Sequence, residues 1–146
     1  AKLTAVFRRH GAVPFKTPLL IPRSAICSHF GSPVYLLDQG GTIVMLPYDL
    51  TLPFARWVAR KEIKSMKRYN IARVFRKDRL GQPKDLNECD FDIIGPNHAH
   101  TIHCCEVVKV IAEVMDAFSA QIPPYRIMIT HMQLLDTVLA AVSITG

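Results

Sequence analysis

The fold of this chain is decided by two stretches of sequence, MKRYNIARVFR at Met66–Arg76 and NECDFDII at Asn87–Ile94. Each is rich in the β-branched and aromatic residues that favour strands, and a polar loop over 77–85 separates them. Alternate side chains of a strand point to opposite faces, so the second stretch places its acidic residues on one face and its apolar residues on the other. We therefore predict a pair of antiparallel strands with one charged face.

Weaker signals on both sides of this pair predict the rest of an α+β domain. Apolar spacing and turn residues indicate helices over 2–10, 51–60, 101–118 and 132–144, the second of them capped by Thr51. Strand-forming runs occupy 12–17, 34–37, 42–46 and 125–129, and 38–41 is a hairpin turn. The third helix should bury an apolar stripe made of Ile102, Val107, Val108, Ile111, Met115 and Phe118. No repeat or linker divides the sequence, so we predict one domain whose strands are mostly antiparallel.

The positive charge of the chain is concentrated in one segment. The net charge is +6, and the segment from Arg56 to Arg79 holds ten basic and two acidic residues, an excess of +8. An excess of this size suits a polyanion such as RNA. The other interpretation is a solvated surface that keeps the chain soluble, and composition alone leaves both open.

Several classes of protein are excluded by the sequence. No apolar run approaches the roughly 20 residues of a membrane helix, and no charged segment precedes a short apolar one, so we expect neither a membrane helix nor secretion. The four cysteines include no CxxC pair, so we expect reduced thiols in the cytoplasm and no disulfide framework. The motifs GxxxxGK, GxGxxG, GxSxG and HExxH are also absent, which excludes the active sites of kinases and hydrolases that depend on them.

The strand–loop–strand is the first place that could carry chemistry. A basic strand ending in Arg76 faces an acidic one, and this arrangement suits a ligand that carries both charges. An arginine side chain binds a phosphate, and a carboxylate binds an ammonium group. A ladder of ion pairs across two strands would give the same pattern, so the sequence favours neither interpretation.

Histidines and cysteines are dense between His98 and Cys105. His100 and Cys104 are four residues apart at a helix start, which is compatible with a metal site. A tetrahedral site needs four converging ligands, however, and no second pair with suitable spacing occurs elsewhere. We predict a loop that enters a helix, without a bound metal, and assign no role to Cys104 or Cys105.

Longer matches extend over most of the chain, at Val34–Gly41 (VYLLDQGG), Leu46–Arg56 (LPYDLTLPFAR), Lys67–Arg76 (KRYNIARVFR) and Cys89–Gly95 (CDFDIIG). In order and spacing they resemble eukaryotic histidyl-tRNA synthetases, up to and including the motif 2 strand–loop–strand. The resemblance implies a class II aminoacyl-tRNA-synthetase-like core, in which an antiparallel sheet is flanked by helices.

The resemblance also implies which part of that fold the chain forms. The segment 7–18 is similar to the end of motif 1, which forms the dimer interface in this family, and 125–146 is similar to the strand and helix after motif 2. The glycine-rich histidine-binding segment and motif 3 would lie beyond Gly146. We therefore expect residues 1–146 to be a partial histidyl-tRNA-synthetase-like domain, taken from a longer protein.

Three departures from the synthetases affect the catalytic site. Synthetases of this type carry an arginine where this chain has Pro47, and their motif 2 loop is longer than 83–88 is here. They also carry a glutamine where this chain has Glu88. A carboxylate repels the phosphates of ATP and cannot donate a hydrogen bond as an amide does. We therefore expect the chain to bind ATP and histidine weakly or not at all, and to need no cofactor.

A second resemblance accounts for these departures. The phrases RRHGA at Arg8–Ala12, TPLLIPR at Thr17–Arg23 and LPYDL at Leu46–Leu50 resemble the histidyl-tRNA-synthetase-like regulatory domain of the general amino-acid-control kinases. That resemblance implies a non-catalytic domain that senses uncharged tRNA and controls an adjacent serine/threonine kinase during amino-acid starvation. Its implied partners are uncharged tRNA, a second copy bound through motif 1, the kinase domain and the ribosome. The alternative is a fragment of a catalytic histidyl-tRNA synthetase, which uses ATP to activate histidine and charge tRNA.

The same resemblance assigns candidate residues. Arg76 matches the motif 2 arginine, which holds an ATP phosphate in synthetases and would contact the acceptor end of tRNA in the sensor. Phe75 beside it would either stack on RNA or belong to the core. The further candidates for tRNA contact are Lys61, Lys64, Lys67 and Arg68. The vestigial pocket for amino acid and ATP would consist of Asp49, Arg76, Glu88 and Asp90.

Overall fold

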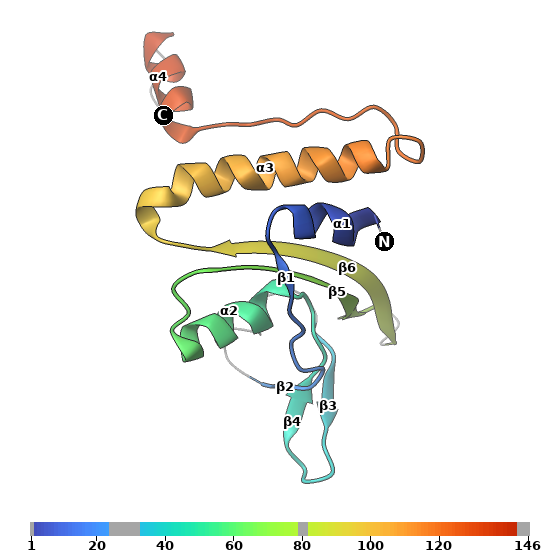
Figure 1. The fold of residues 1–146 in the computed structure, drawn as a ribbon. Coiled ribbons are helices and arrows are strands. Elements are labelled where there is room, and N and C mark those ends of the chain that lie inside the picture. Colours follow the sequence, from blue (N-terminus) through green and yellow to red (C-terminus); the bar gives the residue numbers. More distant parts are fainter. Residues whose placement is uncertain (1, 24–32, 79–81, 143–146) are drawn as a thin grey trace.

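The computed structural model describes residues 2–23, 33–78 and 82–142 of the chain. Its helices are α1 (Lys2–Arg9), α2 (Thr51–Lys61), the 3-10 helix η2 (Asn97–Ala99), α3 (His100–Ala117) and α4 (Met132–Ala141). Its strands are β1 (Val13–Pro14), β2 (Ile21–Pro22), β3 (Tyr35–Leu37), β4 (Ile43–Met45), β5 (Met66–Lys77) and β6 (Pro83–Ile94). The strands form two three-stranded sheets (Figure 1), and the predicted α+β class is confirmed.

The larger sheet has the order β1–β5–β6. β5 and β6 pair antiparallel over their full length, from Met66 opposite Ile94 to Lys77 opposite Pro83, which confirms the predicted strand–loop–strand. β6 begins at Pro83, earlier than the predicted start at Asn87, because the residues opposite the basic end of β5 continue the ladder. β1 pairs with β5 in parallel through two residues only, so the predicted strand over 12–17 was too long.

Helices cover both faces of the larger sheet, with α1 and α3 on one face and α2 on the other (Figure 1). On the first face, the ring of Phe7 in α1 lies 5.5 Å from the rings of Tyr69 and Phe91. Val110 of α3 belongs to the same buried cluster. On the second face, Phe54 of α2 is buried. Tyr69 and Phe91 therefore face α1, and Arg68, which holds Asp90 and Asp92, faces α2.

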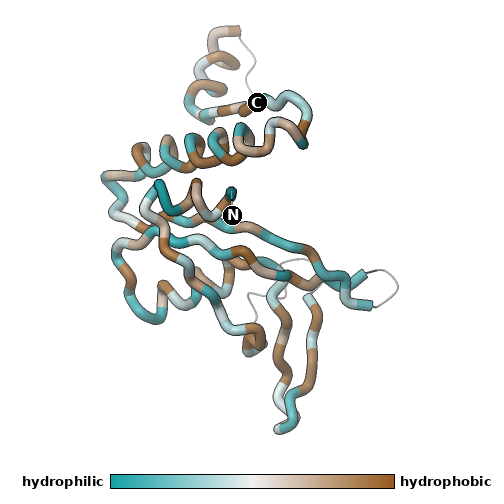
Figure 2. The backbone as a smooth tube through the Cα atoms, turned by 45° about the vertical axis from the view of Figure 1, so that its right-hand side comes forward, coloured by the Kyte–Doolittle hydropathy of each residue, from teal (hydrophilic) through white to brown (hydrophobic). Residues whose placement is uncertain are grey.

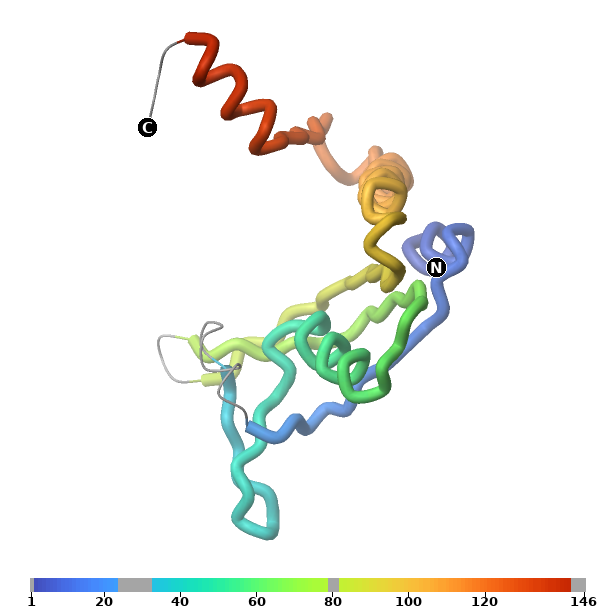
Figure 3. Tube along the Cα trace, turned by 90° about the vertical axis from the view of Figure 1, so that its left-hand side faces the viewer, coloured from blue at the N-terminus to red at the C-terminus, as the bar shows by residue number. Residues whose placement is uncertain are grey.

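The smaller sheet, of order β2–β4–β3, contains the hairpin that projects away from the rest of the molecule (Figures 1 and 3). Its turn is the predicted one, because Asp38 accepts a 2.8 Å hydrogen bond from the Thr42 N–H and Gly41 has a φ of 77°. Ile21 and Met45 form a small core at its base. Both strands of the hairpin are rich in apolar residues (Figure 2), and several of these are exposed.

Two sequence predictions for the C-terminal half were wrong. The predicted strand over 125–129 lies outside the strands of the structure, and Ile129 is 74% exposed. Alternating apolar residues make a strand only where a partner strand supplies the hydrogen bonds. On α3, Ile102 and Ile111 of the predicted apolar stripe are exposed, and Val110 is the buried residue instead. Val110 packs with Val6 and Phe7 of α1, so contact with α1 decides which face of α3 is covered.

Candidate functional site

Arg68 lies at the centre of the charged face of the larger sheet. Its side chain is fully buried, and its guanidinium carbon lies 4.0 Å from the centre of the Phe54 ring. Nη2 donates 3.0 Å hydrogen bonds to the Leu50 carbonyl and to the Asp90 carboxylate. The same nitrogen forms an ion pair with Asp92 at 2.5 Å, without hydrogen-bond geometry. Arg68 therefore neutralises two carboxylates from inside the domain.

This burial corrects one predicted contact. Arg68 was expected to bind an RNA backbone, but none of its side chain reaches the surface. Within the described residues, its Nε and Nη1 have no hydrogen-bond partner, so Nη2 makes all of its hydrogen bonds. Burial raises the pKa of Asp92, against the attraction of the Arg68 guanidinium. The cluster is thus an internal structural element of the domain.

Glu88 and Arg76 form a second ion pair on the same face. Glu88 Oε1 accepts a 2.9 Å hydrogen bond from the Leu50 N–H, which fixes the carboxylate against the chain. Glu88 Oε2 lies 3.4 Å from Arg76 Nη2, and the Arg76 guanidinium carbon lies 4.8 Å from the centre of the Tyr48 ring. The Arg76 side chain remains 42% exposed, so it can reach a ligand from outside.

The segment before α2 is tied to the sheet by its backbone. The carbonyl of Pro47 accepts a 2.7 Å hydrogen bond from the Phe75 N–H. Asp49 accepts a 2.8 Å hydrogen bond from the Leu52 N–H in the first turn of α2. Thr51, predicted as the cap, donates to Asp90 at 2.7 Å instead. Asp49 and Asp90, two members of the predicted vestigial pocket, are therefore already engaged by the domain itself.

The predicted lysine contacts do not form one surface. Lys61 and Lys64 are exposed, at and just after the end of α2. Lys67 points to the other face of the sheet. There its Nζ donates hydrogen bonds of 2.6 and 2.8 Å to the two carboxylate oxygens of Glu106 on α3. Lys61 and Lys64 stay candidates for RNA contact, and Lys67 has a structural partner.

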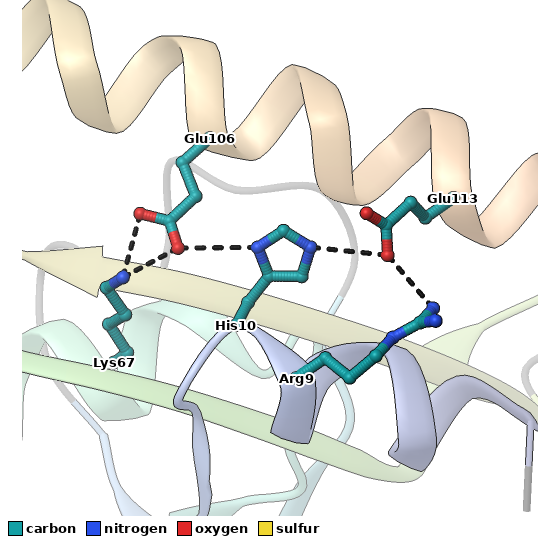
Figure 4. Close-up of polar contacts among 5 residues, drawn as sticks. All are labelled: Arg9, His10, Lys67, Glu106 and Glu113. Carbon is teal, nitrogen blue, oxygen red and sulfur yellow. Dashed lines mark hydrogen bonds and ion pairs between the residues drawn. The ribbon is translucent and has the colours of Figure 1, made fainter.

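A polar network that the sequence did not predict joins α1 to α3 (Figure 4). The ring of His10 lies between two carboxylates, with Nδ1 3.4 Å from Glu106 and Nε2 3.4 Å from Glu113. Arg9 adds a 2.9 Å ion pair to Glu113. Glu106 and Glu113 are seven residues apart on one side of α3, and this spacing is the only sequence signal for the network.

Because of this network, the stability of the domain should depend on pH in the acidic range. The hydrogen bond from Lys67 lowers the pKa of Glu106 below its ordinary value of 4.5, and His10 adds to this effect. Because the folded-state pKa is lowered, the stabilisation is present above pH 4.5 and is lost as the pH falls through the folded-state pKa. We expect Glu106→Gln to lower the free energy of unfolding by about 1 kcal/mol at pH 7 and to weaken its dependence on acid.

Urea denaturation at pH 7 and below pH 4.5 measures both effects. Glu62→Gln, at an exposed position, is the matched control and should behave as the parent chain does. Equal acid dependence in the Glu106 variant and the parent would contradict the assigned contacts.

The dense histidines and cysteines surround the start of α3. Cys104 Sγ lies 3.7 Å from His100 Nδ1, and the His103 ring lies against Gly95, where a Cβ atom would be 2.1 Å from it. Within the described residues, no group of three or more His, Cys, Asp or Glu side chains is placed to hold a metal. Cys89, Cys104 and Cys105 are free thiols, and Cys27 lies outside the described residues.

Over residues 2–23, 33–78 and 82–142, no helix is both long and apolar enough to cross a membrane.

No family model matches the chain, but comparison with known sequences finds relatives of two kinds. The eIF-2-alpha kinase GCN2 of Rattus norvegicus is 42% identical over 140 residues, which cover 94% of this chain and 8% of the kinase. The cytoplasmic histidine–tRNA ligase of Oryza sativa is 41% identical over 143 residues, which cover 94% of this chain and 18% of the ligase. The chain thus spans less than a fifth of the length of these relatives.

Solved structures agree on the fold. An ATP phosphoribosyltransferase regulatory subunit/histidyl-tRNA synthetase from Bacillus halodurans has a TM-score of 0.66 at 23% identity, covering 80% of this chain and 32% of that chain. The histidine–tRNA ligase subunit of Alicyclobacillus acidocaldarius has a TM-score of 0.65 at 22% identity, covering 99% and 43%. The predicted class II synthetase fold is confirmed. The chain is a histidyl-tRNA-synthetase-like domain, similar to the one in the eIF-2-alpha kinases GCN2.

Proposed function

We propose that this chain is a non-catalytic regulatory domain that binds uncharged tRNA and controls an adjacent serine/threonine kinase in the amino-acid starvation response of translation. The identity with GCN2 supports a kinase as the whole protein. The observation that carries the non-catalytic part is Glu88, whose carboxylate is fixed by the Leu50 N–H beside Arg76. The proposal includes a cytoplasmic location and contact with the ribosome.

The charged face is poorly suited to ATP. In the synthetases that the chain resembles, the arginine at the position of Arg76 holds a phosphate. Here the anchored Glu88 carboxylate lies 3.4 Å from that arginine and would repel a phosphate brought to it. Pro47, which stands where the synthetases have an arginine, contributes only its carbonyl, and that group is bonded to β5. Two of the positive charges that a nucleotide would use are therefore neutralised or missing.

A ligand that binds the exposed cations from the surface of the domain is better suited to the site than ATP is. Arg76 is partly exposed, and Lys61 and Lys64 are exposed near the end of α2. A polyanion can replace Glu88 as the partner of Arg76, because the pair is partly exposed and exposed pairs contribute only about 0–1 kcal/mol. Backbone phosphates of tRNA supply many negative charges at once, which supports an RNA partner over a single small anion.

Calorimetry with ATP and with histidine tests the non-catalytic part. We expect no heat of binding for either ligand at concentrations up to about 1 mM. Each dissociation constant should therefore exceed about 1 mM, which corresponds to a binding free energy weaker than about −4 kcal/mol. A catalytic histidine–tRNA ligase in the same buffer is the positive control. Micromolar binding of both ligands, or formation of histidyl-adenylate, would overturn the proposal. It would favour the second candidate, a catalytic histidyl-tRNA synthetase fragment, which the identity with the rice ligase supports.

We also propose that the domain forms a homodimer through the motif 1 region. β1 lies at an open edge of the larger sheet, and Val13 in it is 50% exposed. An exposed strand edge with an apolar side chain is a ready site for pairing with a second copy. Light scattering should give twice the mass of one chain at tens of micromolar, and a mass of one chain at that concentration would count against the dimer.

A further inference from the structure

A groove lies along one side of α2, away from the charged face of the sheet. It has a volume of about 430 Å³, and the segment 18–22 forms its other wall. The helix contributes five residues at the spacing of a single helical face: Pro53, Arg56, Trp57, Arg60 and Lys61. Phe54, next to Trp57 on α2, packs against Arg68 of the sheet, and the part of Trp57 that is not buried lines the groove.

Trp57 gives the groove an aromatic wall that is held in place. The centre of its ring lies 4.4 Å from that of Phe15 and 6.1 Å from that of Phe54. The indole is only partly buried, and its remaining surface lines the groove. Leu20 and Pro18 make the facing wall apolar and are themselves exposed. A fixed aromatic ring opposite an apolar wall suits a flat ligand, which can stack without ordering new side chains.

The rim of the groove is positively charged. Arg56, Arg60 and Lys61 line it, Arg56 with a 3.5 Å hydrogen bond to the Pro22 carbonyl, and none of the described residues that line it is acidic. Arg60 and Lys61 are exposed in the last turn of α2, and the exposed Lys64 follows three residues later. A flat apolar slot with cations along one side is complementary to a nucleotide, in which a base is joined to a phosphate chain.

We propose that this groove is a subsite for one unpaired nucleotide of the bound tRNA, with the base against Trp57 and the adjoining phosphates against Arg60 and Lys61. The inference rests on the proposed function and extends it to a second place of contact. A helical peptide would need a longer trough, because such peptides anchor residues over two turns or more. The groove volume instead falls within the range of about 300–1,000 Å³ of small-ligand sites.

The fluorescence of Trp57 tests the proposal directly, because the chain contains one tryptophan. Single-stranded hexa-adenylate and deacylated tRNA are titrated into the chain, and the anisotropy of labelled tRNA is followed in parallel. Poly-glutamate supplies the acidic-peptide arm, and inorganic phosphate supplies the anion arm. We expect hexa-adenylate and tRNA to quench the emission by about half or more through stacking, and poly-glutamate and phosphate to leave it nearly unchanged.

Charge reversal supplies the matched pair of variants. Arg60→Glu should weaken hexa-adenylate binding by about tenfold, since a phosphate contact is replaced by a repulsion. Lys109→Glu, an exposed reversal on α3, should leave it unchanged.

Three outcomes would separate the possibilities. Binding of tRNA by anisotropy without any change in Trp57 emission would overturn the subsite and leave the proposed function standing. Equal quenching by poly-glutamate would overturn it in favour of an acidic protein partner. Quenching by hexa-adenylate with no binding of tRNA would contradict the proposed function, and with it the assignment of the bound nucleotide to tRNA.

Discussion

Replacing Arg68 with methionine is expected to lower the free energy of unfolding by about 3–5 kcal/mol, as breaking a buried ion pair from one side does. Methionine fills a similar volume and can lie on Phe54, but it leaves Asp90 and Asp92 without their counter-charge. Each of these carboxylates has a side chain only 20% exposed, so water relieves little of their repulsion. The hydrogen bond to the Leu50 carbonyl is lost as well. Urea denaturation at pH 7 measures the effect.

Arg73→Met on the same strand is the matched control. Arg73 lies 3.4 Å from Asp85, and both side chains are more than half exposed. Exposed pairs of this kind contribute about 0–1 kcal/mol, so this variant should be nearly as stable as the parent chain. Similar losses in the two variants would show that burial is not what makes Arg68 important, and would contradict the description of the charged face.

Replacing Arg76 with leucine is expected to weaken the binding of deacylated tRNA by about tenfold, which corresponds to about 1.4 kcal/mol. The stability of the chain should change by less than about 1 kcal/mol, because the pair with Glu88 is partly exposed. If Arg76 meets the acceptor end, the loss should be larger for intact tRNA than for tRNA that lacks its 3′ terminus. Anisotropy and thermal unfolding on the same preparation measure the two quantities.

If the charged face is only a ladder of ion pairs, the expectation for Arg76→Leu is the opposite. If Arg76 serves only to hold Glu88, its loss should lower the melting temperature and leave tRNA affinity unchanged. Glu88→Gln separates the two further, because it frees Arg76 without removing it, and tRNA should then bind at least as tightly as before. Weaker binding by Glu88→Gln would count against a direct contact between Arg76 and RNA.

The central strands could be predicted from the sequence, and so could the side on which each residue lies. Alternation of acidic and apolar residues in β6 requires a charged face, and the structure has one. The hairpin turn at 38–41 was also predictable, since Asp38 and Gly41 each supply what the turn needs, a side-chain acceptor and a positive φ.

What covers each face could not be predicted in the same way. The pattern of β5 gives Arg68 and Arg76 the same face, but only the position of α2 makes one of them buried and the other accessible. The ion-pair interpretation therefore holds for Arg68, and the ligand-binding interpretation stays a prediction that rests on Arg76, which can reach solvent. The groove beside Trp57 was missed for a similar reason, since half of it comes from the segment 18–22.

We propose that the domain binds tRNA through its phosphates, and the salt dependence of that binding tests this claim most directly. The affinity for labelled deacylated tRNA is measured by anisotropy between 50 and 200 mM potassium chloride. Several counterions should leave the tRNA when its phosphates pair with Arg76, Lys61, Lys64 and the other cations of the groove. The logarithm of the binding constant should therefore fall linearly with the logarithm of the salt concentration. We expect saturable binding at 50 mM salt and a loss of about tenfold or more at 200 mM. Absence of saturable binding at 50 mM salt, or an affinity that does not change with salt, would contradict the claim.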